Sequence, residues 1–412
     1  MLKSKILAFA KKHRLVLTLM RSIKIFAGRL VYLPHLLFTK TDEKMIFFEA
    51  YMGRQYSCSP KEIYRRMLCD DYFSDYKFVW AFRDTDEFGF LQKNKNTVII
   101  KSGGRDYFRY LAAAKYWVVN SRLNEAVVKK SGQVYVQCWH GTPLKKLGYD
   151  IDAKNGNAMN SVKDIRYKHR ADSKRYTYMI SPSPFCSDKF ASAFNLRDRS
   201  IIKETGYPRN DYLYNYTEED ALSVREKLNI PKDKKVILYA PTWRDNQHDP
   251  AKGYTYEVQL DFSEMQKAIG EDYVILFRSH YFISNYIDLA DYEGFVYNVS
   301  QYNDINELYI ISDLLVTDYS SVFFDYANLK RPMLFYMYDF DEYKNEMRDF
   351  YIDISELPGP IVKTRQELTE EIFNIDSYNR KYGEKYIDFY NKYNCLDDGN
   401  SAQRVIEILK EA

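Results

Sequence analysis

Two histidines stand in sequence contexts that could support acid–base chemistry. The chain has only six histidines in 412 residues. His140 lies within Val136-Gln-Cys-Trp-His-Gly-Thr-Pro-Leu-Lys-Lys146, and His280 ends the run Phe277-Arg-Ser-His280, each after an apolar, strand-like stretch. Because imidazole titrates near neutrality, it can accept a proton from a hydroxyl nucleophile. The two positions predict one active site assembled from two halves of the chain.

The residues after His140 suit the end of a strand. Gly141 permits tight backbone geometry, and Pro143 can begin the next segment. The imidazole is therefore expected at the strand's end, facing a cleft. Lys145 and its neighbour Lys146 add positive potential for an anionic partner. The alternative is a structural histidine bonded to its own turn, but this context favours a functional one.

The run that ends at His280 places a guanidinium and an imidazole in one loop. Arg278 can bind phosphate oxygens with paired donors, and His280 can donate to the oxygen of a leaving phosphate. Together they suit a phosphate ester as the leaving group. The plainer alternative gives Arg278 an ordinary salt bridge.

A third motif joins an apolar strand to two serines at the start of a helix. It runs Leu314-Leu-Val-Thr-Asp-Tyr-Ser-Ser321 and continues to Pro332. The N-terminus of a helix attracts anions through its free N–H groups and positive dipole end, and the hydroxyls of Ser320 and Ser321 add donors. A plain N-cap serine is the competing interpretation.

Other polar side chains also follow predicted strands. Thr242 and Arg244 could face the same cleft, although an ordinary loop without a functional role fits the sequence equally well. The chain contains neither a P-loop nor a dinucleotide fingerprint. Its five cysteines are scattered, and His169 and His248 lack ligand spacing, so no metal site is predicted.

Length and composition predict a folded protein of two domains. A chain of 412 residues is larger than one core usually supports. With 46% hydrophobic and 28% charged residues, it fits neither a disordered nor an integral membrane protein. Apolar runs alternate with helix-like segments, as in an α/β fold with parallel sheets and a cleft at the carboxyl ends of the strands. Strands are expected at 45–50, 76–82, 97–102, 116–120, 134–139, 178–181, 201–204, 236–240, 273–277, 294–299, 314–317 and 333–337.

The first 40 residues form a basic segment that contains no acid. Its apolar runs are broken by lysine and arginine, so none approaches the roughly 20 residues that cross a bilayer. Apolar and basic residues at helical spacing are typical of an interfacial helix on anionic lipid. The alternatives are a helix packed on the protein's own body, or nucleic-acid binding. The last has no supporting motif, so no nucleic-acid partner is predicted.

Taken in order, these motifs resemble the CDP-glycerol glycerophosphotransferase family, the teichoic-acid primases and polymerases of Gram-positive bacteria. The resemblance covers roughly residues 45 to 390. The matching stretches are Phe47-Phe-Glu-Ala-Tyr-Met-Gly-Arg-Gln-Tyr-Ser57, His140-Gly-Thr-Pro-Leu-Lys145, Ser181-Pro-Ser-Pro-Phe185, Gly206-Tyr-Pro-Arg-Asn210, Tyr239-Ala-Pro-Thr-Trp-Arg244, Arg278-Ser-His280 and Thr317-Asp-Tyr-Ser-Ser321 through Arg331-Pro332. One departure is Tyr281, where the family's loop often continues with proline.

The resemblance implies a GT-B-like fold of two Rossmann-like domains facing a cleft. The expected divisions are a basic amphipathic segment over 1–40, an acceptor domain over 41–205, a donor domain over 206–395, and a helix over 396–412 that returns to the first domain. By the same resemblance His140 is the general base and His280 a contact or acid at the diphosphate. Substrate-binding residues are expected to be Arg278, Ser320, Ser321, Lys330, Arg331, Thr242, Arg244 and Lys145.

The reaction implied is attack of an acceptor hydroxyl on the alcohol-bearing phosphorus of a CDP-alcohol. It forms a phosphodiester and releases CMP. The donor is expected to be CDP-glycerol or CDP-ribitol, without a cofactor or obligatory metal. The implied acceptor is linked to undecaprenyl diphosphate, which gives the basic N-terminus a purpose: it holds the enzyme peripherally at the cytoplasmic face of the membrane.

Two other functions remain open at this point. A GT-B glycosyltransferase would use the same architecture to move a sugar from a nucleotide donor to a cell-envelope acceptor, releasing UDP or GDP. A non-catalytic scaffold on the membrane surface would tolerate loss of both histidines but not of its basic N-terminal charges. Sequence alone chooses neither glycerol nor ribitol, nor an oligomeric state.

Overall fold

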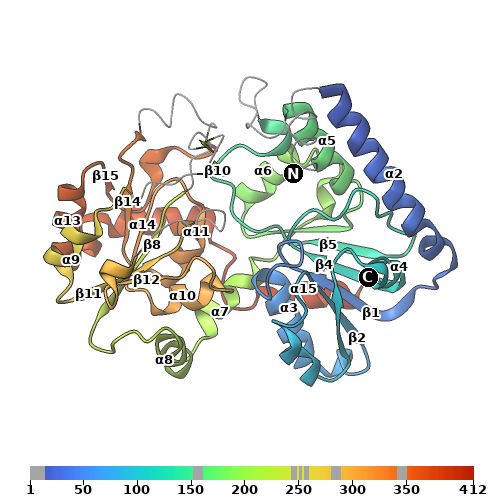
Figure 1. Cartoon of the computed structure of the whole chain (residues 1–412), viewed down its shortest axis with the longest axis horizontal. Coiled ribbons are helices and arrows are strands. Elements are labelled where there is room, and N and C mark those ends of the chain that lie inside the picture. The colour runs from blue at the N-terminus through green and yellow to red at the C-terminus, as the bar shows by residue number, and fades with distance from the viewer. Residues whose placement is uncertain are drawn as a thin grey trace.

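The computed structural model describes residues 14–151, 161–242, 248–249, 253–254, 259–279, 289–340 and 350–412. Within these ranges the chain forms two parallel-stranded sheets, each surrounded by helices (Figure 1). Each sheet carries its own hydrophobic core. The α/β architecture predicted from the alternating pattern is therefore confirmed.

The first sheet has seven strands in the order β3-β2-β1-β4-β5-β6-β7, and all neighbouring pairs are parallel. The order reverses between β1 and β4, which in open sheets is where a ligand crevice forms at the carboxyl ends of the strands. The strands are β1 (Asp42–Glu49), β2 (Lys77–Phe82), β3 (Thr97–Lys101), β4 (Ala114–Val119), β5 (Val134–Gln137), β6 (Tyr178–Ser181) and β7 (Ile202–Glu204).

The second sheet has six strands in the order β12-β11-β8-β13-β14-β15, again all parallel. Its order reverses between β8 and β13. The strands are β8 (Lys235–Ala240), β11 (Tyr273–Phe277), β12 (Val296–Asn298), β13 (Leu314–Thr317), β14 (Met333–Tyr336) and β15 (Ile361–Val362). The short pair β9 (His248–Asp249) and β10 (Gly253–Tyr254) and the edge strand β15 were not predicted, because two residues are too few to show a pattern.

Helices lie in many of the connections between successive strands, as is usual for parallel pairing. Local signals fix several of their starts: Thr217 and Asp220 form a capping box before α8, and Asp304 accepts the N–H of Asn306 at the start of α10. The described helices are α2 (Arg14–Phe38), α3 (Cys58–Leu68), α4 (Arg105–Ala113), α5 (Val162–Ser173), α6 (Pro184–Ala193), α7 (Asp211–Asn215), α8 (Glu218–Lys227), α9 (Phe262–Ile269), α10 (Ile305–Ile311), α11 (Val322–Tyr326), α13 (Arg365–Phe373), α14 (Tyr378–Tyr393) and α15 (Ser401–Lys410).

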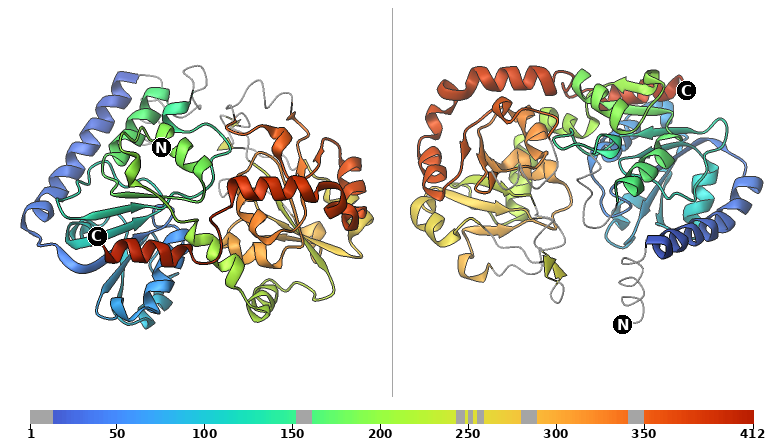
Figure 2. Two further views of the ribbon diagram at one scale, coloured as in Figure 1. Left: turned by 180° about the vertical axis from the view of Figure 1, so that it is seen from behind. Right: turned by 90° about the horizontal axis from the view of Figure 1, so that it is seen from above.

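Helix α2 lies along the outside of the first domain (Figures 1 and 2). One face is fixed to the body: Arg21 pairs with Glu125 at 2.6 Å, and the hydroxyl of buried Tyr32 donates to the carbonyl of Val128. The other face carries exposed apolar side chains. They are Leu19, Met20, Ile23, Phe26, Leu30, Val31, Leu33, Leu37 and Phe38. The first 13 residues, with several of the basic side chains of the predicted segment, lie outside the described residues.

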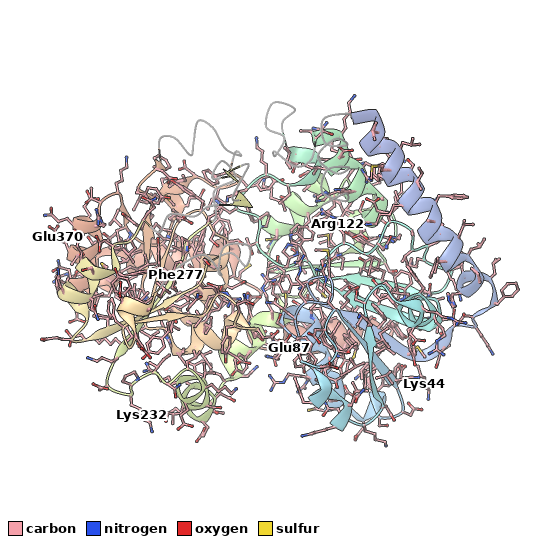
Figure 3. The ribbon with its side chains drawn as sticks, viewed as in Figure 1. Lys44, Glu87, Arg122, Lys232, Phe277 and Glu370 are labelled. Carbon is pink, nitrogen blue, oxygen red and sulfur yellow. The ribbon has the colours of Figure 1, made fainter. Side chains whose placement is uncertain are left out.

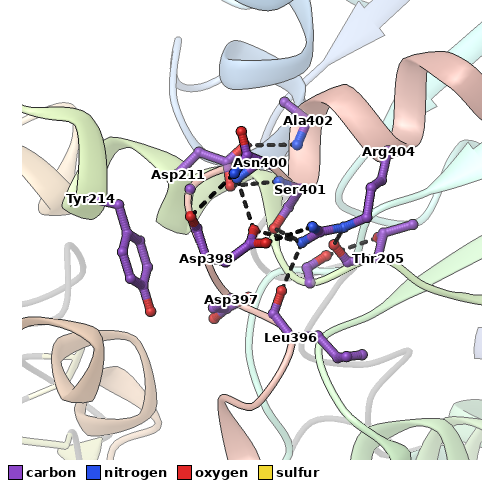
Figure 4. Close-up of polar contacts among 12 residues, drawn as sticks. Thr205, Asp211, Tyr214, Leu396, Asp397, Asp398, Asn400, Ser401, Ala402 and Arg404 are labelled. Atoms are coloured by element: carbon purple, nitrogen blue, oxygen red, sulfur yellow. Dashed lines mark hydrogen bonds and ion pairs between the residues drawn. The ribbon is translucent and has the colours of Figure 1, made fainter.

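The chain crosses between the domains twice, and the two crossings bind each other (Figure 4). After the first crossing, the carboxylate of Asp211 accepts the N–H groups of Ser401 and Ala402 and thereby caps α15. Arg404 in α15 donates to the carbonyl of Thr205. Helix α15 packs beside α3, so the C-terminal helix returns to the first domain (Figure 2).

A polar clasp joins the domains at a separate place. Lys61 of α3 lies 2.6 Å from Asp304 and 3.5 Å from Glu307, with the lysine and Asp304 buried. Nearby, Asn303 accepts the N–H of Tyr56 and donates to its carbonyl. Because Tyr56 follows β1 and Asn303 precedes α10, the clasp sets the distance between the two carboxyl edges.

Candidate active site

The loop after β5 holds His140 at the carboxyl edge of the first sheet. Trp139, buried and in the left-handed region with φ +46°, turns the chain sharply there, and its N–H donates to Oε1 of Gln137. A bulky residue in that region is rare and costs conformational energy. The ring of Trp139 lies 4.2 Å from that of His140, centroid to centroid. The turn therefore presents the imidazole at the sheet edge, where its sequence context predicted it.

A hydrogen bond fixes the tautomer of His140. Its Nδ1 lies 2.7 Å from the carbonyl oxygen of Asn120, which follows β4. A carbonyl only accepts, so Nδ1 carries the proton and Nε2 is left with a lone pair. On the other side, the Tyr51 ring lies 5.8 Å from the imidazole, and the N–H of Tyr51 donates to Oδ1 of Asn120 at 2.7 Å. The site thus forms where β1 meets β4.

The pKa of His140 is lowered to about 4, chiefly by desolvation of the ring. The hydrogen bond to Asn120 acts in the opposite direction and raises the pKa, whereas the positive charges of Arg209 and Arg122 lower it. Protein atoms surround the ring closely, yet solvent reaches it, so the desolvation is incomplete. The direction is unaffected: the imidazole is neutral at pH 7. A neutral ring with a free Nε2 is the form that can accept a proton.

The second sheet brings four predicted residues to its own carboxyl edge. Thr242 follows β8, Arg278 follows β11, and Ser320 and Ser321 follow β13. The N–H of Thr242 donates to Oδ1 of Asp318, which ties the loops after β8 and β13 together. Figure 3 shows Phe277, the last residue of β11, in the second domain, and Arg122, just beyond β4, in the first.

Arg278 is half-buried, and one of its guanidinium nitrogens already donates to backbone carbonyls. Its Nη1 donates to the carbonyls of Val299 and Tyr302, at 2.9 and 3.0 Å, which fixes the guanidinium plane. Among the described residues, Nε and Nη2 have no hydrogen-bond partner, so they remain for a ligand. Burial lowers the pKa of Arg278, although an arginine stays charged at any physiological pH. The salt-bridge alternative does not hold within the described residues.

The two serines also keep their hydroxyls available. Ser321 is the N-cap residue of α11, but its side chain makes no capping hydrogen bond. Helix α11 has only five residues before it tightens into a 3₁₀ turn over Ala327–Leu329. The hydroxyls, rather than a long helix dipole, are therefore what this loop offers to an anion.

The two edges meet at Gly141 and Ser321. A Cβ added to Gly141 would lie 3.1 Å from Oγ of Ser321. Beyond Gly141 the chain continues onto the second domain: Leu144 belongs to the second core, its carbonyl accepts the N–H of Tyr351, and Lys145 forms a bridge with Phe350. The motif around His140 is thus part of both domains, and it carries Lys145 to the second domain.

Lys330 and Arg331 lie away from this edge, so the structure does not bring them to the predicted phosphate site. They precede β14 and sit at the opposite, amino edge of the second sheet. The guanidinium of Arg331 donates to the carbonyls of Ile310 and Ser312 and to the hydroxyl of Tyr216. Lys330 is exposed, with Nζ 5.0 Å from the centroid of the Tyr390 ring. Both serve structure at these positions.

His280 and Arg244 lie outside the described residues, so their predicted roles stay predictions. Within the described ranges, no group of three or more histidine, cysteine, aspartate or glutamate side chains is arranged to hold a metal ion.

Two contributors were missed by sequence reasoning. Asn120 carries no motif, and only the strand order places it beside His140. Arg209 lies in Gly206-Tyr-Pro-Arg-Asn210, which was noted but given no role. Its guanidinium is buried, stacks 3.6 Å from the centroid of Tyr207, and binds both carboxylate oxygens of Asp325. Because Asp325 is in α11, this pair fixes the serine loop to the junction between the domains.

The fold and the paired edges define a GT-B-type protein of two Rossmann-like domains. The family model described as CDP-Glycerol:Poly(glycerophosphate) glycerophosphotransferase matches residues 31–411, and the chain belongs to this family. The resemblance seen in the motifs is thereby confirmed.

Individual relatives agree with the family. The chain is 39% identical, over 100% of its length, to a teichoic acid poly(glycerol phosphate) polymerase of Bacillus subtilis, and it covers 53% of that protein. It is 38% identical to a teichoic acid glycerol-phosphate transferase of Staphylococcus aureus, with 94% of this chain and 98% of the relative covered. A teichoic acid poly(ribitol-phosphate) polymerase of Bacillus spizizenii is 34% identical over 66% of this chain.

Among solved structures, the chain matches the wall teichoic acid polymerase TagF with a TM-score of 0.85 and 38% identity, over 96% of each chain. Another structure of that polymerase was obtained after soaking with CDPG. The chain spans about half the length of the Bacillus subtilis polymerase, so what it shares with that protein is one part of it.

Proposed function

We propose that this protein transfers glycerol phosphate from CDP-glycerol to a hydroxyl of a lipid-linked acceptor, releasing CMP, in the synthesis of teichoic acid or a related cell-wall polymer. The single observation that carries the proposal is the meeting of the two carboxyl edges at Gly141 and Ser321. A base on one edge and anion donors on the other match the two substrates of such a transfer. Family membership supports the same reaction over a glycosyl transfer.

In the proposed mechanism His140 is the general base. Nε2 accepts the proton of the acceptor hydroxyl while its oxygen forms a bond to the β-phosphorus of the donor. The bond between that phosphorus and the bridging oxygen breaks, and CMP leaves with the bonding electrons. General-base catalysis contributes typically 10²- to 10⁴-fold to the rate. His280 keeps its proposed place beside the diphosphate, as a contact or as an acid.

The second edge is proposed to hold the donor's phosphates. Arg278 offers Nε and Nη2, and the hydroxyls of Ser320 and Ser321 stand in the loop after β13, at the same carboxyl edge of the sheet. Thr242, Lys145 and Arg244 are proposed as further contacts. Fixed cations and N–H or O–H donors stabilise charge that develops on a departing phosphate. We therefore propose that no cofactor is needed, so that a chelator should leave the rate unchanged.

Glycerol is proposed over ribitol. The chain is more similar to the glycerol-phosphate relatives than to the ribitol-phosphate polymerase, both in identity and in the share of the chain that aligns. The chain covers only part of one polymerase but nearly all of a transferase. The length of the lipid product will therefore decide whether one unit or many are added.

We also propose that α2 holds the enzyme on the anionic inner surface of the membrane. None of the described helices is long and apolar enough to cross a bilayer. The outer face of α2 instead exposes Leu19, Phe26 and Leu37 by more than half of their surface, beside the basic residues Lys24 and Arg29. An apolar stripe with flanking cations suits the lipid interface. Replacing Leu19, Phe26 and Leu37 with serine should abolish co-sedimentation with phosphatidylglycerol vesicles and leave donor binding intact.

The reaction itself is tested by by-product analysis. Purified protein is given CDP-glycerol, CDP-ribitol or a nucleotide sugar, each with a synthetic undecaprenyl-diphosphate-linked acceptor. The proposal expects CMP from CDP-glycerol at a rate well above that from CDP-ribitol, and the length of the lipid product reports one transfer or many. Release of UDP or GDP from a nucleotide sugar, with no CMP, would refute it.

A further inference from the structure

Asn120 uses two of its polar groups next to His140 and leaves a third without a partner among the described residues. Its carbonyl oxygen accepts from Nδ1 of His140 at 2.7 Å, and its Oδ1 accepts from the N–H of Tyr51 at 2.7 Å. Its Nδ2 is buried and finds no hydrogen-bond partner in the described parts of the chain. The whole residue is fully buried, with 0% of its surface exposed. One residue thus holds both the base and the loop that packs against it.

The side chain at position 120 is an amide although its nitrogen has no hydrogen-bond partner within the described ranges, and this calls for an explanation. An aspartate would accept the N–H of Tyr51 equally well and would leave no unsatisfied donor. Leaving a buried donor unpaired is costly, so the amide needs another reason. A carboxylate beside the imidazole would favour its protonated form, which cannot act as a base. It would also repel the diphosphate of a donor.

We propose that Asn120 is the positioning residue of the base: its carbonyl selects the Nδ1–H tautomer of His140, its Oδ1 holds Tyr51 against the ring, and its neutral amide keeps the imidazole uncharged. The proposal rests on the proposed function, because it assigns Asn120 a role in the proton transfer attributed to His140. Asn120 acts through His140 and touches no reacting atom.

The other charged and titratable groups around the ring do not replace this role. Arg122, two residues beyond Asn120, and Arg209 at the domain junction both oppose protonation of His140. Tyr51 and Cys138 are neutral at pH 7, because burial raises the pKa of each well above its usual value. Among the described residues, no carboxylate is a cause of the shift in the pKa of His140, so a charge placed at Asn120 would be the first there.

The test replaces Asn120 with aspartate, which keeps the acceptor for Tyr51 and changes mainly the charge. The control is Asn124→Asp, in the same loop, where Oδ1 likewise accepts a backbone N–H, that of Ala126, at 2.9 Å. Asn124 is exposed and has no contact with His140. Its variant should therefore behave as the wild type.

The first readout is the pKa of His140, followed by NMR of protein labelled at its histidines. In Asn120→Asp it should rise by at least about one pH unit, since an opposite charge within a few ångströms raises a histidine pKa by one to three. The acid limb of kcat/KM should rise by the same amount, and activity lost at pH 7 should return at higher pH. In the wild type, the ring nitrogen shifts should report the Nδ1–H tautomer.

An unshifted His140 pKa in folded Asn120→Asp would overturn the proposal, as would an Nε2–H tautomer in the wild type. Asn120→Ala gives a second check: it should lower kcat through the lost hold on Tyr51 and leave the His140 pKa unraised. Failure of the proposed function looks different, because the wild type would then release no CMP or His140→Ala would be fully active, whatever the NMR titration shows.

Discussion

Gly141 and Ser321 come from different sheets, 180 residues apart in sequence, and a side chain on the glycine would have to begin 3.1 Å from the serine hydroxyl. Gly141 adjoins the proposed base His140, and Ser321 belongs to the proposed phosphate loop. One close contact between the domains therefore lies between the proposed base and the proposed anion site.

Gly141→Ala should separate these two halves of the site. Its backbone lies outside the left-handed region, so alanine is tolerated locally, but the new Cβ presses on Ser321. We expect KM for CDP-glycerol to rise about tenfold, the equivalent of about 1.4 kcal/mol, with little change in melting temperature. The control is Gly89→Ala, where a Cβ would meet nothing within 4 Å. Wild-type kinetics in Gly141→Ala would show that the contact does not matter.

The pH dependence should reveal a histidine that resists protonation. Desolvation lowers the pKa of His140 from 6.5 to about 4, and a base works above its pKa. The value of kcat/KM should therefore stay level as pH falls from 8 through 6.5, and its acid limb should have a midpoint below 6.5. The unfolded chain takes up this proton first, so stability should also fall as pH drops from 6.5 towards 4. An acid limb centred at 7 or above would contradict the assignment.

Arg278 and Arg331 should respond differently to the same substitution. Arg278→Lys keeps the charge but loses the paired donors, so KM for CDP-glycerol should rise at least about tenfold. It also loses the hydrogen bonds to the carbonyls of Val299 and Tyr302, so its melting temperature should fall as well. Arg331→Lys should lose the hydrogen bonds to the carbonyls of Ile310 and Ser312, lowering the melting temperature without changing KM. Steady-state kinetics and thermal unfolding on both variants check this, and the reverse pattern would put the phosphate site at the wrong edge.

The clasp between the domains should depend on Lys61. Lys61→Met leaves the carboxylates of Asp304, Glu307 and Glu62 near one another without their cation. Burial already raises the pKa of Glu62 to about 7. Removing one partner of a buried ion pair costs about 3–5 kcal/mol, which urea unfolding would measure. Asp304→Asn is the control, since its amide oxygen still accepts from Lys61, and a loss of about 1 kcal/mol is expected. A loss in Lys61→Met no larger than that in Asp304→Asn would contradict this dependence on the lysine.

Most of the fold could be predicted from the sequence because buried parallel strands are apolar along their length. Strands such as Tyr273–Phe277 and Leu314–Thr317 were predicted at the observed bounds. Pattern carries no information on strand order, however, and the order is what brings Asn120 beside His140. Residues with no motif, buried between elements distant in sequence, were therefore missed.

The site residues whose position in the fold was predicted correctly are those whose place follows from the end of a strand. His140, Arg278, Ser320 and Ser321 directly follow strands, and parallel sheets gather such residues at one edge. Lys330 and Arg331 were grouped with them because the matching stretch of the family resemblance runs from Thr317 through Arg331 and Pro332. Between Ser321 and Lys330, helix α11 and its 3₁₀ turn carry the chain from the carboxyl edge of the sheet to its amino edge. Residues that are close in sequence here therefore lie at opposite edges.

The central claim is that His140 is the base of a transfer whose donor is held by the opposite edge. The most direct measurement compares CMP release from CDP-glycerol by wild type and His140→Ala with the lipid-linked acceptor, alongside calorimetric binding of CDP-glycerol to each. The account predicts a 10²- to 10⁴-fold loss of CMP release in the variant and unchanged donor binding. Equal rates of CMP release, or a loss explained entirely by weaker donor binding, would contradict it.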